Sequence, residues 1–119
     1  MYTSNYTGAE IDDGIRPYKV YTAILTQADT DAPAAVVLEN TLGGAVVWTR
    51  NAVGQYFGTL ADAFTLNKTF CILQDYAWDG EVGNTLTPFS VNRIDLVIVA
   101  GDGFLVAGNP AFIEIRVYP

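Results

Sequence analysis

The sequence predicts an all-β protein, a β-sandwich of jelly-roll type with a short N-terminal arm. Residues that suit a pleated, half-buried surface (Val, Ile, Thr, Tyr, Phe and Trp) make up 47 of the 119 positions. Short apolar stretches alternate with segments rich in Gly, Asn, Asp and Pro, the spacing typical of sandwiches and barrels. With 50% hydrophobic and 16% charged residues, the chain is expected to fold as one compact domain.

The strands are predicted in chain order from their apolar content and from the turn residues between them. The first five predicted strands are Tyr18 to Gln27, Ala35 to Glu39, Ala45 to Arg50, Gln55 to Leu60 and Thr69 to Gln74. Arg93 to Ala100 follows, and its run Leu96 to Val99 is apolar on both faces, which predicts a central strand covered on both sides. Gly103 to Val106 is predicted as a short strand.

The last strand gives the clearest pattern. Ile113, Ile115 and Val117 alternate with more polar neighbours, a period of two that predicts one buried and one exposed face. The two strands with the strongest patterns supply the predicted core residues, which are Leu96, Ile98, Ile113, Ile115 and Val117.

Three connections have lengths that suit hairpins: Leu42 to Gly44, Asn51 to Gly54 and Ala100 to Gly103. Thr59 to Phe64 is too short for an independent helix and is predicted as a loop. Asp79 to Asn92 is predicted as an irregular segment and as the longest connection.

The polar composition of residues 1–17 predicts an N-terminal arm, and residues 18–119 are predicted to form a single domain. The arm contains Asp12-Asp13-Gly14 and ends at Pro17, which interrupts regular structure. The arm is predicted either as a frayed terminus or as a segment that attaches to a neighbouring subunit or to a particle. The side chains that would anchor it are Tyr2, Tyr6, Ile11 and Ile15.

The charge balance argues against two classes of partner. The chain carries a net charge of −7, and its six basic residues are scattered singly. Binding to nucleic acid or to an anionic membrane surface draws on clustered Lys and Arg, so neither partner is expected. No apolar run approaches the roughly 20 residues of a membrane-spanning helix.

Residue counts also limit the chemistry. The absence of histidine excludes nucleophilic catalysis of the Ser-His or Cys-His type. Cys71 is the only cysteine, so no intramolecular disulfide or Cys-rich metal site can form, and its apolar neighbours predict a small buried residue. A glycosidase needs only two carboxylates, which leaves that class open. We expect no enzymatic activity and no cofactor.

One acidic and aromatic cluster is the candidate ligand contact. Ca²⁺ binds carboxylate oxygens and a sugar ring stacks on an aromatic face, so a calcium ion and a surface glycan are its candidate ligands. The alternative is a solvated turn at Asp79-Gly80. Trp48 is predicted to pack in the core or between subunits, not against a ligand. The cluster consists of Asp75, Tyr76, Trp78, Asp79 and Glu81.

Several segments resemble a β-rich module of structural proteins from tailed phages and prophages, especially those of Bacteroidota hosts. The resemblance covers most of residues 18–118. In that family such modules usually form the end of fibre, tail or capsid-surface proteins. The resemblance therefore implies a virion component that assembles with other virion proteins. No catalytic motif accompanies it. The segments are Tyr18 to Gln27, Asp31 to Pro33, Val37 to Gly44, Val47 to Arg50, Val53 to Tyr56, Asn67 to Thr69 and Phe112 to Tyr118.

These observations predict a non-enzymatic virion structural protein that acts in assembly or host-surface attachment. The ratio of apolar to charged residues is high for so short a chain, which predicts a homo-oligomer, with a trimer as the favoured form. The alternative function is a carbohydrate-binding or other adhesive module, which would require Tyr76 and Trp78 to be exposed in a loop.

Overall fold

A computed structural model describes residues 17–27, 31–74, 84–98 and 110–119 of the chain. Eight β-strands lie within these residues. They are β1 (Lys19–Thr26), β2 (Ala34–Asn40), β3 (Val47–Ala52), β4 (Gln55–Thr59), β5 (Thr69–Gln74), β6 (Thr85–Ser90), β7 (Arg93–Val97) and β8 (Ala111–Val117).

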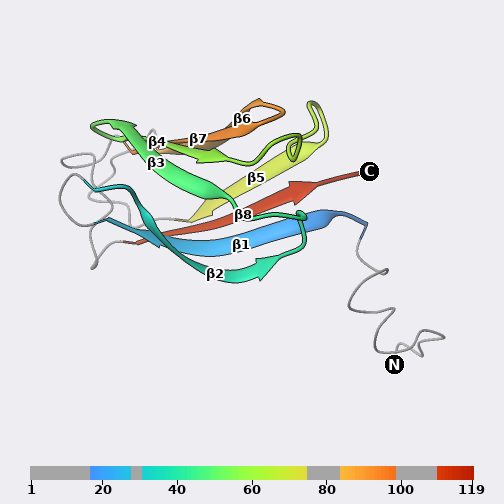
Figure 1. The fold of residues 1–119 in the computed structure, drawn as a ribbon, viewed down its shortest axis with the longest axis horizontal. Helices are drawn as coiled ribbons and strands as arrows, with labels where there is room; N and C mark the ends of the chain where they lie inside the picture. Colours follow the sequence, from blue (N-terminus) through green and yellow to red (C-terminus); the bar gives the residue numbers. More distant parts are fainter. Residues whose placement is uncertain (1–16, 28–30, 75–83, 99–109) are drawn as a thin grey trace.

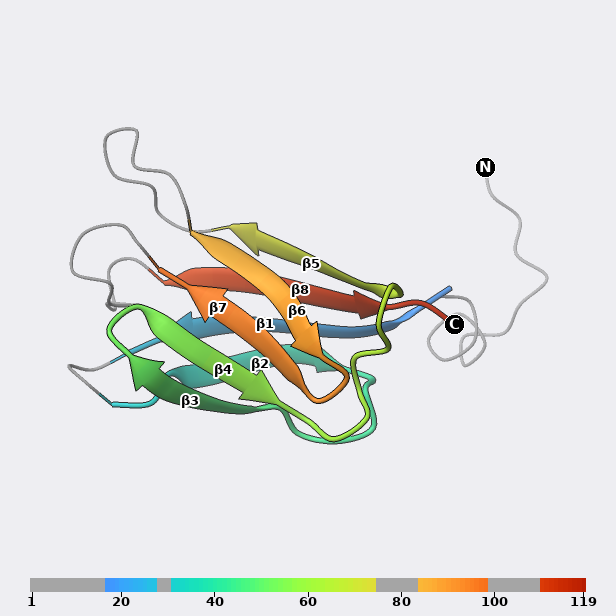
Figure 2. The ribbon, with the colours of Figure 1, turned by 90° about the horizontal axis from the view of Figure 1, so that it is seen from above.

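The strands form two four-stranded sheets that are stacked on one another (Figure 1). Sheet A has the strand order β2-β1-β8-β5, sheet B has the order β3-β4-β7-β6, and every pairing is antiparallel. Figure 2 shows the strands of sheet B crossing obliquely over those of sheet A. The predicted all-β sandwich is therefore confirmed.

The jelly-roll connectivity is not confirmed by this strand order. Three pairs of neighbouring strands within a sheet, β1 with β2, β3 with β4 and β6 with β7, are also consecutive along the chain. The predicted strand Gly103 to Val106 and the predicted hairpin Ala100 to Gly103 lie outside the described residues.

The hydrophobic core lies between the two sheets. Along the strands of each sheet, alternate side chains point inward and form this core. Tyr21 and Leu25 of β1 contribute from sheet A, and Tyr56 of β4 contributes from sheet B, each with no solvent exposure. The predicted core residues are all buried in this cluster: Leu96, Ile98, Ile113, Ile115 and Val117.

Two side-chain hydrogen bonds join the sheets across the core. The indole Nε1 of Trp48 donates to the Tyr21 hydroxyl at 3.1 Å, and the Tyr56 hydroxyl donates to Oε1 of Gln27. Buried polar groups need such partners, because an unpaired one loses its hydrogen bonds to water without compensation. Trp48 is 6% exposed, so its predicted role in packing is confirmed as core packing.

The connection at Leu42 to Gly44 is not a hairpin, because β2 and β3 lie in different sheets. This segment carries the chain from sheet A to sheet B, and Leu42 packs into the core on the way. Gly43 has a φ of +98°, a conformation that glycine adopts without steric cost. The predicted hairpin at Asn51 to Gly54 is confirmed, since β3 and β4 pair directly.

The predicted irregular segment Asp79 to Asn92 contains a strand, β6. Leu86 points into the core at 7% exposure, and Val91-Asn92 turns the chain into β7. Pro88 lies within this strand, although proline cannot donate to a β-ladder. Such a residue is accepted on an outermost strand, and β6 is the outermost strand of sheet B.

β7 is an interior strand, as predicted, but it is not covered on both sides. Ile94 and Leu96 point into the core with no exposure, whereas Arg93 and Asp95 lie on the outer face and are only partly buried. No second layer packs on that face among the described residues. The apolar run around Leu96 therefore reflects one buried face and one half-exposed valine, Val97.

Candidate interaction surface

The outer face of sheet A, the face turned away from sheet B, carries large apolar side chains in contact with solvent. We call these residues the sheet A patch. Five of the six are clearly exposed, at 61%, 61%, 56%, 38% and 42% in the order given below, and Ile24 is half-buried. The sheet A patch consists of Val36, Leu38, Phe70, Ile72, Phe112 and Ile24.

Strand register brings these side chains together, although they are far apart in the sequence. Ile24 of β1 lies directly opposite Phe112 of β8 on one side and Val36 of β2 on the other. Residues directly opposite on paired strands have Cβ atoms about 4.5–5.5 Å apart. The three side chains therefore form a continuous apolar row across β2, β1 and β8.

Phe70 and Ile72 extend the patch onto β5. They lie opposite Arg116 and Glu114 of β8, respectively. A shallow groove of about 250 Å³ runs over this face, and its lining includes Ile24, Leu38, Ile72 and Phe112. The patch thus reaches all four strands of sheet A, and the groove that joins Ile72 to Phe112 and Ile24 is also lined by Glu114 and Arg116.

Among the described residues, three charged side chains lie on this face: Glu39 of β2, opposite Thr22, and the pair Glu114 and Arg116 of β8. Nε of Arg116 donates to Oε2 of Glu114 at 2.5 Å, and the Thr22 hydroxyl donates to Oε1 of the same carboxylate at 3.4 Å. The pKa of Arg116 is raised, mainly by its hydrogen bond to Glu114, so the guanidinium keeps its charge. Its CZ atom also lies 4.9 Å from the ring centroid of Tyr18. The charges of this pair cancel, and Glu39 on β2 is the other charged side chain that the structure describes on this face.

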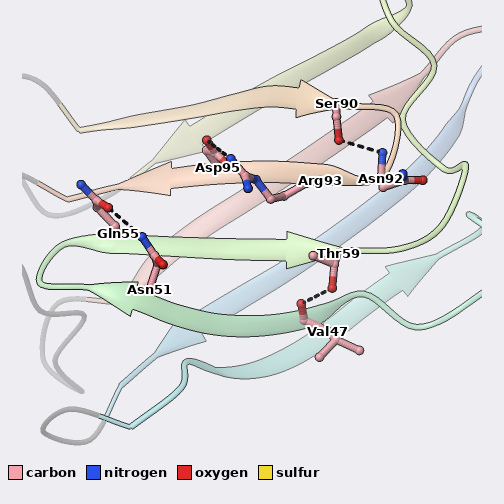
Figure 3. Close-up of polar contacts among 8 residues, drawn as sticks. All are labelled: Val47, Asn51, Gln55, Thr59, Ser90, Asn92, Arg93 and Asp95. Atoms are coloured by element: carbon pink, nitrogen blue, oxygen red, sulfur yellow. Dashed lines mark hydrogen bonds and ion pairs between the residues drawn. The ribbon is translucent and has the colours of Figure 1, made fainter.

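The outer face of sheet B has a different composition (Figure 3). Arg93 forms an ion pair with Asp95 at 2.7 Å, and Nδ2 of Asn51 donates to Oε1 of Gln55 at 3.0 Å. The hydroxyl of Thr59 donates to the carbonyl oxygen of Val47 at 3.3 Å. This is the polar surface expected of a sheet face that water covers.

Two aromatic rings on this polar face hold the Arg93 guanidinium between them. Its CZ atom lies 3.9 Å from the ring centroid of Phe57 and 3.6 Å from that of Phe89, which is 61% exposed. Cation–π contacts of this kind fix the guanidinium in place. The Arg93–Asp95 pair is therefore held in one orientation beside an exposed ring.

The described residues are electrically neutral as a set. They carry five of the thirteen acidic and five of the six basic side chains. The other eight acidic residues and one basic residue, which account for the net charge of −7, belong to residues outside the described ranges. The five acidic residues are Asp31, Glu39, Asp62, Asp95 and Glu114, and the five basic residues are Lys19, Arg50, Lys68, Arg93 and Arg116.

A larger cavity of about 690 Å³ lies at the end of the sandwich where β1 begins and β8 ends. Tyr18 and Tyr118 meet there with ring centroids 5.1 Å apart. Lys19, Lys68 and Asp62 also line this cavity, so cationic, anionic and aromatic groups are mixed in it. No group of three or more His, Cys, Asp or Glu side chains that could hold a metal ion occurs among the described residues.

Cys71 is half-buried and packs against the core. Burial raises the pKa of its thiol to about 12, so the thiol stays protonated near neutral pH and is a poor nucleophile. This agrees with the predicted packing role.

The candidate ligand cluster lies outside the described residues, and so does the candidate assembly arm. The cluster is Asp75, Tyr76, Trp78, Asp79 and Glu81, and the arm residues are Tyr2, Tyr6, Ile11 and Ile15.

The sheet A patch was not predicted from the sequence, although two signals pointed to it. Ala34 to Leu38 and Phe70 to Leu73 are apolar at every position, so each strand must place apolar side chains on both faces. Val37 shows the result: it lies opposite the buried Ala23 on the core side of sheet A and is still 49% exposed. β2 therefore presents apolar residues on both of its faces.

Comparisons of the chain with family models, with curated proteins and with solved structures found no match. Within the described ranges, no helix has the length and apolar character needed to span a membrane. The class of protein that the fold and surface define is thus an antiparallel β-sandwich in which the outer face of sheet A carries more large apolar side chains than the outer face of sheet B.

Proposed function

We propose that the protein is a non-enzymatic structural component of a phage virion, at a fibre, tail or capsid surface, which acts in assembly or host attachment as a homo-oligomer. The observation that carries the proposal is the sheet A patch. Soluble monomers rarely expose contiguous apolar patches larger than a few hundred Å², and larger ones mark interaction sites. A protein whose role is assembly requires such a surface.

The contrast between the two outer faces supports this interpretation. Both faces belong to the same sandwich. The outer face of sheet B carries threonine, amide and ion-paired side chains beside Val47, Phe57 and Phe89, whereas six valine, leucine, isoleucine and phenylalanine side chains gather on the outer face of sheet A around one ion pair. An exposed sheet face with alternating polar residues is the ordinary case. The apolar face therefore needs a covering partner, as subunits of a virion have.

The homo-oligomer is tested by the mass of the full chain in solution. Light scattering over a wide concentration range should give a multiple of 12.9 kDa, and a trimer is the expected species. A monomer at every concentration would contradict the proposed assembly. Immunogold labelling of particles purified from a producing culture tests the virion location, and unlabelled particles would contradict it.

Saccharide binding is the second candidate function, and the outer face of sheet B provides the observation that favours it. The exposed ring of Phe89 offers a surface for a sugar ring, and the neighbouring Arg93–Asp95 pair offers fixed donors and acceptors for hydroxyl groups. Binding to a glycan array, lost in Phe89→Ala, would support this function. The absence of binding to any glycan would rule it out.

A further inference from the structure

We infer that the sheet A patch is the surface on which a second copy of this chain docks. The inference rests on the homo-oligomer of the proposed function and adds to it the face, the strands and the side chains that make the contact. The contact is between sheet faces, with Ile24, Ile72 and Phe112 at its centre, where the groove lies.

The charge distribution favours a second copy over a charged partner. Glu114 is bonded by Arg116 and by Thr22, so this ion pair adds no net charge to the sheet A patch. Glu39 on β2 is the other charged side chain described on this face, and a single carboxylate offers little to a partner that recognises charge. Two copies of a chain with a net charge of −7 repel each other, and that repulsion is smallest where the facing surfaces are neutral.

The size of the face fits a contact between subunits. Strands about 4.8 Å apart with about 3.3 Å of rise per residue give a face of roughly 19 by 23 Å for four strands of about seven residues. Its projected area of roughly 440 Å² is about half of the roughly 800 Å² of accessible surface that each partner contributes to a standard interface. Accessible area exceeds projected area, so the face supplies most of such an interface, and association should depend on concentration.

The composition of the patch allows closed symmetry. Its two sides are both apolar, with Val36 and Leu38 on β2 and Phe70 and Ile72 on β5. When copies turn this face toward a common axis, the β2 side of one copy can meet the β5 side of the next, and no patch remains uncovered. Closed arrangements of this kind are usual for identical subunits.

Two valines provide a matched test. Val36 is 61% exposed on the outermost strand of sheet A, and Val47 is 57% exposed on the outermost strand of sheet B, each on the outer face of its sheet. Val36→Glu and Val47→Glu change the net charge equally and remove the same side chain. We expect Val36→Glu to weaken self-association about a hundredfold or more, because it places a carboxylate in an apolar contact. Val47→Glu should leave it unchanged.

A second pair of variants tests whether the loss of association is confined to substitutions in β2. Phe112→Ser removes the ring in the middle of the sheet A patch, whereas Phe89→Ser removes an exposed ring on the outer face of sheet B. Sedimentation equilibrium measures association, and circular dichroism establishes that each variant is folded. Weaker association in Val36→Glu and Phe112→Ser, but in neither control, is the expected result.

The outcomes separate this inference from the proposed function. If the unmodified chain associates and the sheet A variants associate equally well, the contact lies elsewhere, and the inference is overturned while the homo-oligomer stands. If the control variants lose association as strongly as the sheet A variants, the assignment to sheet A is also overturned. If the unmodified chain is a monomer at all concentrations, the proposed homo-oligomer fails.

Discussion

Gly58 of β4 lies directly opposite Trp48 of β3, and a Cβ atom at position 58 would stand 2.9 Å from Cη2 of the indole ring. Because glycine has no side chain, the indole ring of Trp48 can lie over β4 at this position. Trp48 is 6% exposed. The indole then reaches the Tyr21 hydroxyl of sheet A. A glycine in sheet B thus permits one of the two side-chain hydrogen bonds that join the sheets.

We expect Gly58→Ala to destabilise the protein by about 1–3 kcal/mol, the usual effect of overpacking a core. The added methyl group would press on three ring atoms at 2.9–3.0 Å, and the ring cannot move without disturbing the bond to Tyr21. Unfolding in urea, followed by tryptophan fluorescence, measures the change.

Gly44→Ala is the control for this variant. A Cβ atom at position 44 would also meet an atom at 2.9 Å, but that atom is Cδ1 of Leu60, the end of a flexible and partly exposed side chain. Its cost should be clearly smaller than that of Gly58→Ala. Equal losses in the two variants would show that the Trp48 contact has no special role.

Tyr21→Phe should cost about 1–3 kcal/mol, because it leaves the buried indole N–H of Trp48 without its partner. The aromatic ring and its packing are kept, so the loss reports the hydroxyl. Combining Tyr21→Phe with Trp48→Phe gives a double-mutant cycle. A coupling energy near zero would mean that the hydrogen bond contributes nothing to stability.

Stability should fall at alkaline pH. Burial raises the pKa of the Cys71 thiol from 9.0 to about 12 and also raises the pKa of Tyr21 and of Tyr56. Each group binds its proton more tightly in the folded state, so its contribution is complete below the unfolded pKa and is lost as the pH rises toward the folded pKa. The free energy of unfolding should therefore decrease from pH 9 to pH 12, and less steeply in Cys71→Ala. A constant value over that range would contradict this.

Deleting residues 1–16 should change the free energy of unfolding by less than about 2 kcal/mol. These residues lack the apolar periodicity of a core strand, so we expect the core between the two sheets to form without them. Self-association or attachment to particles should weaken instead, if the arm acts on a neighbour. Thermal unfolding and sedimentation of the shortened chain measure the two effects, and a larger loss of stability would make the arm part of the fold.

Most strands could be predicted because their signal is local. The alternation of Ile113, Ile115 and Val117 already names the buried face of β8, since successive side chains of a strand point to opposite sides. Leu96 and Ile98 were predicted from an uninterrupted apolar run instead, and both are buried in the core. β6 was missed because Pro88 is a poor strand residue except on an outermost strand, and position in a sheet is not a local property.

The sheet A patch could not be predicted from the sequence. β5 and β7 both contain apolar runs in the sequence. On β5 the outer face carries exposed Phe70 and Ile72. On β7 the outer face carries the charged side chains Arg93 and Asp95. Whether an apolar outer position is covered depends on a second layer of structure, and that layer can come from distant sequence or from another molecule.

The sequence by itself determined the all-β class, most strand positions and the core residues, because composition and period-two alternation act within a single strand. The tertiary structure alone decided which strands share a sheet, that the segment around Gly43 crosses between sheets, and that Ile24, Phe112 and Val36 lie side by side. These relationships depend on pairing between strands up to about ninety residues apart. Such pairing is fixed by the packing of the whole core, which no single segment contains.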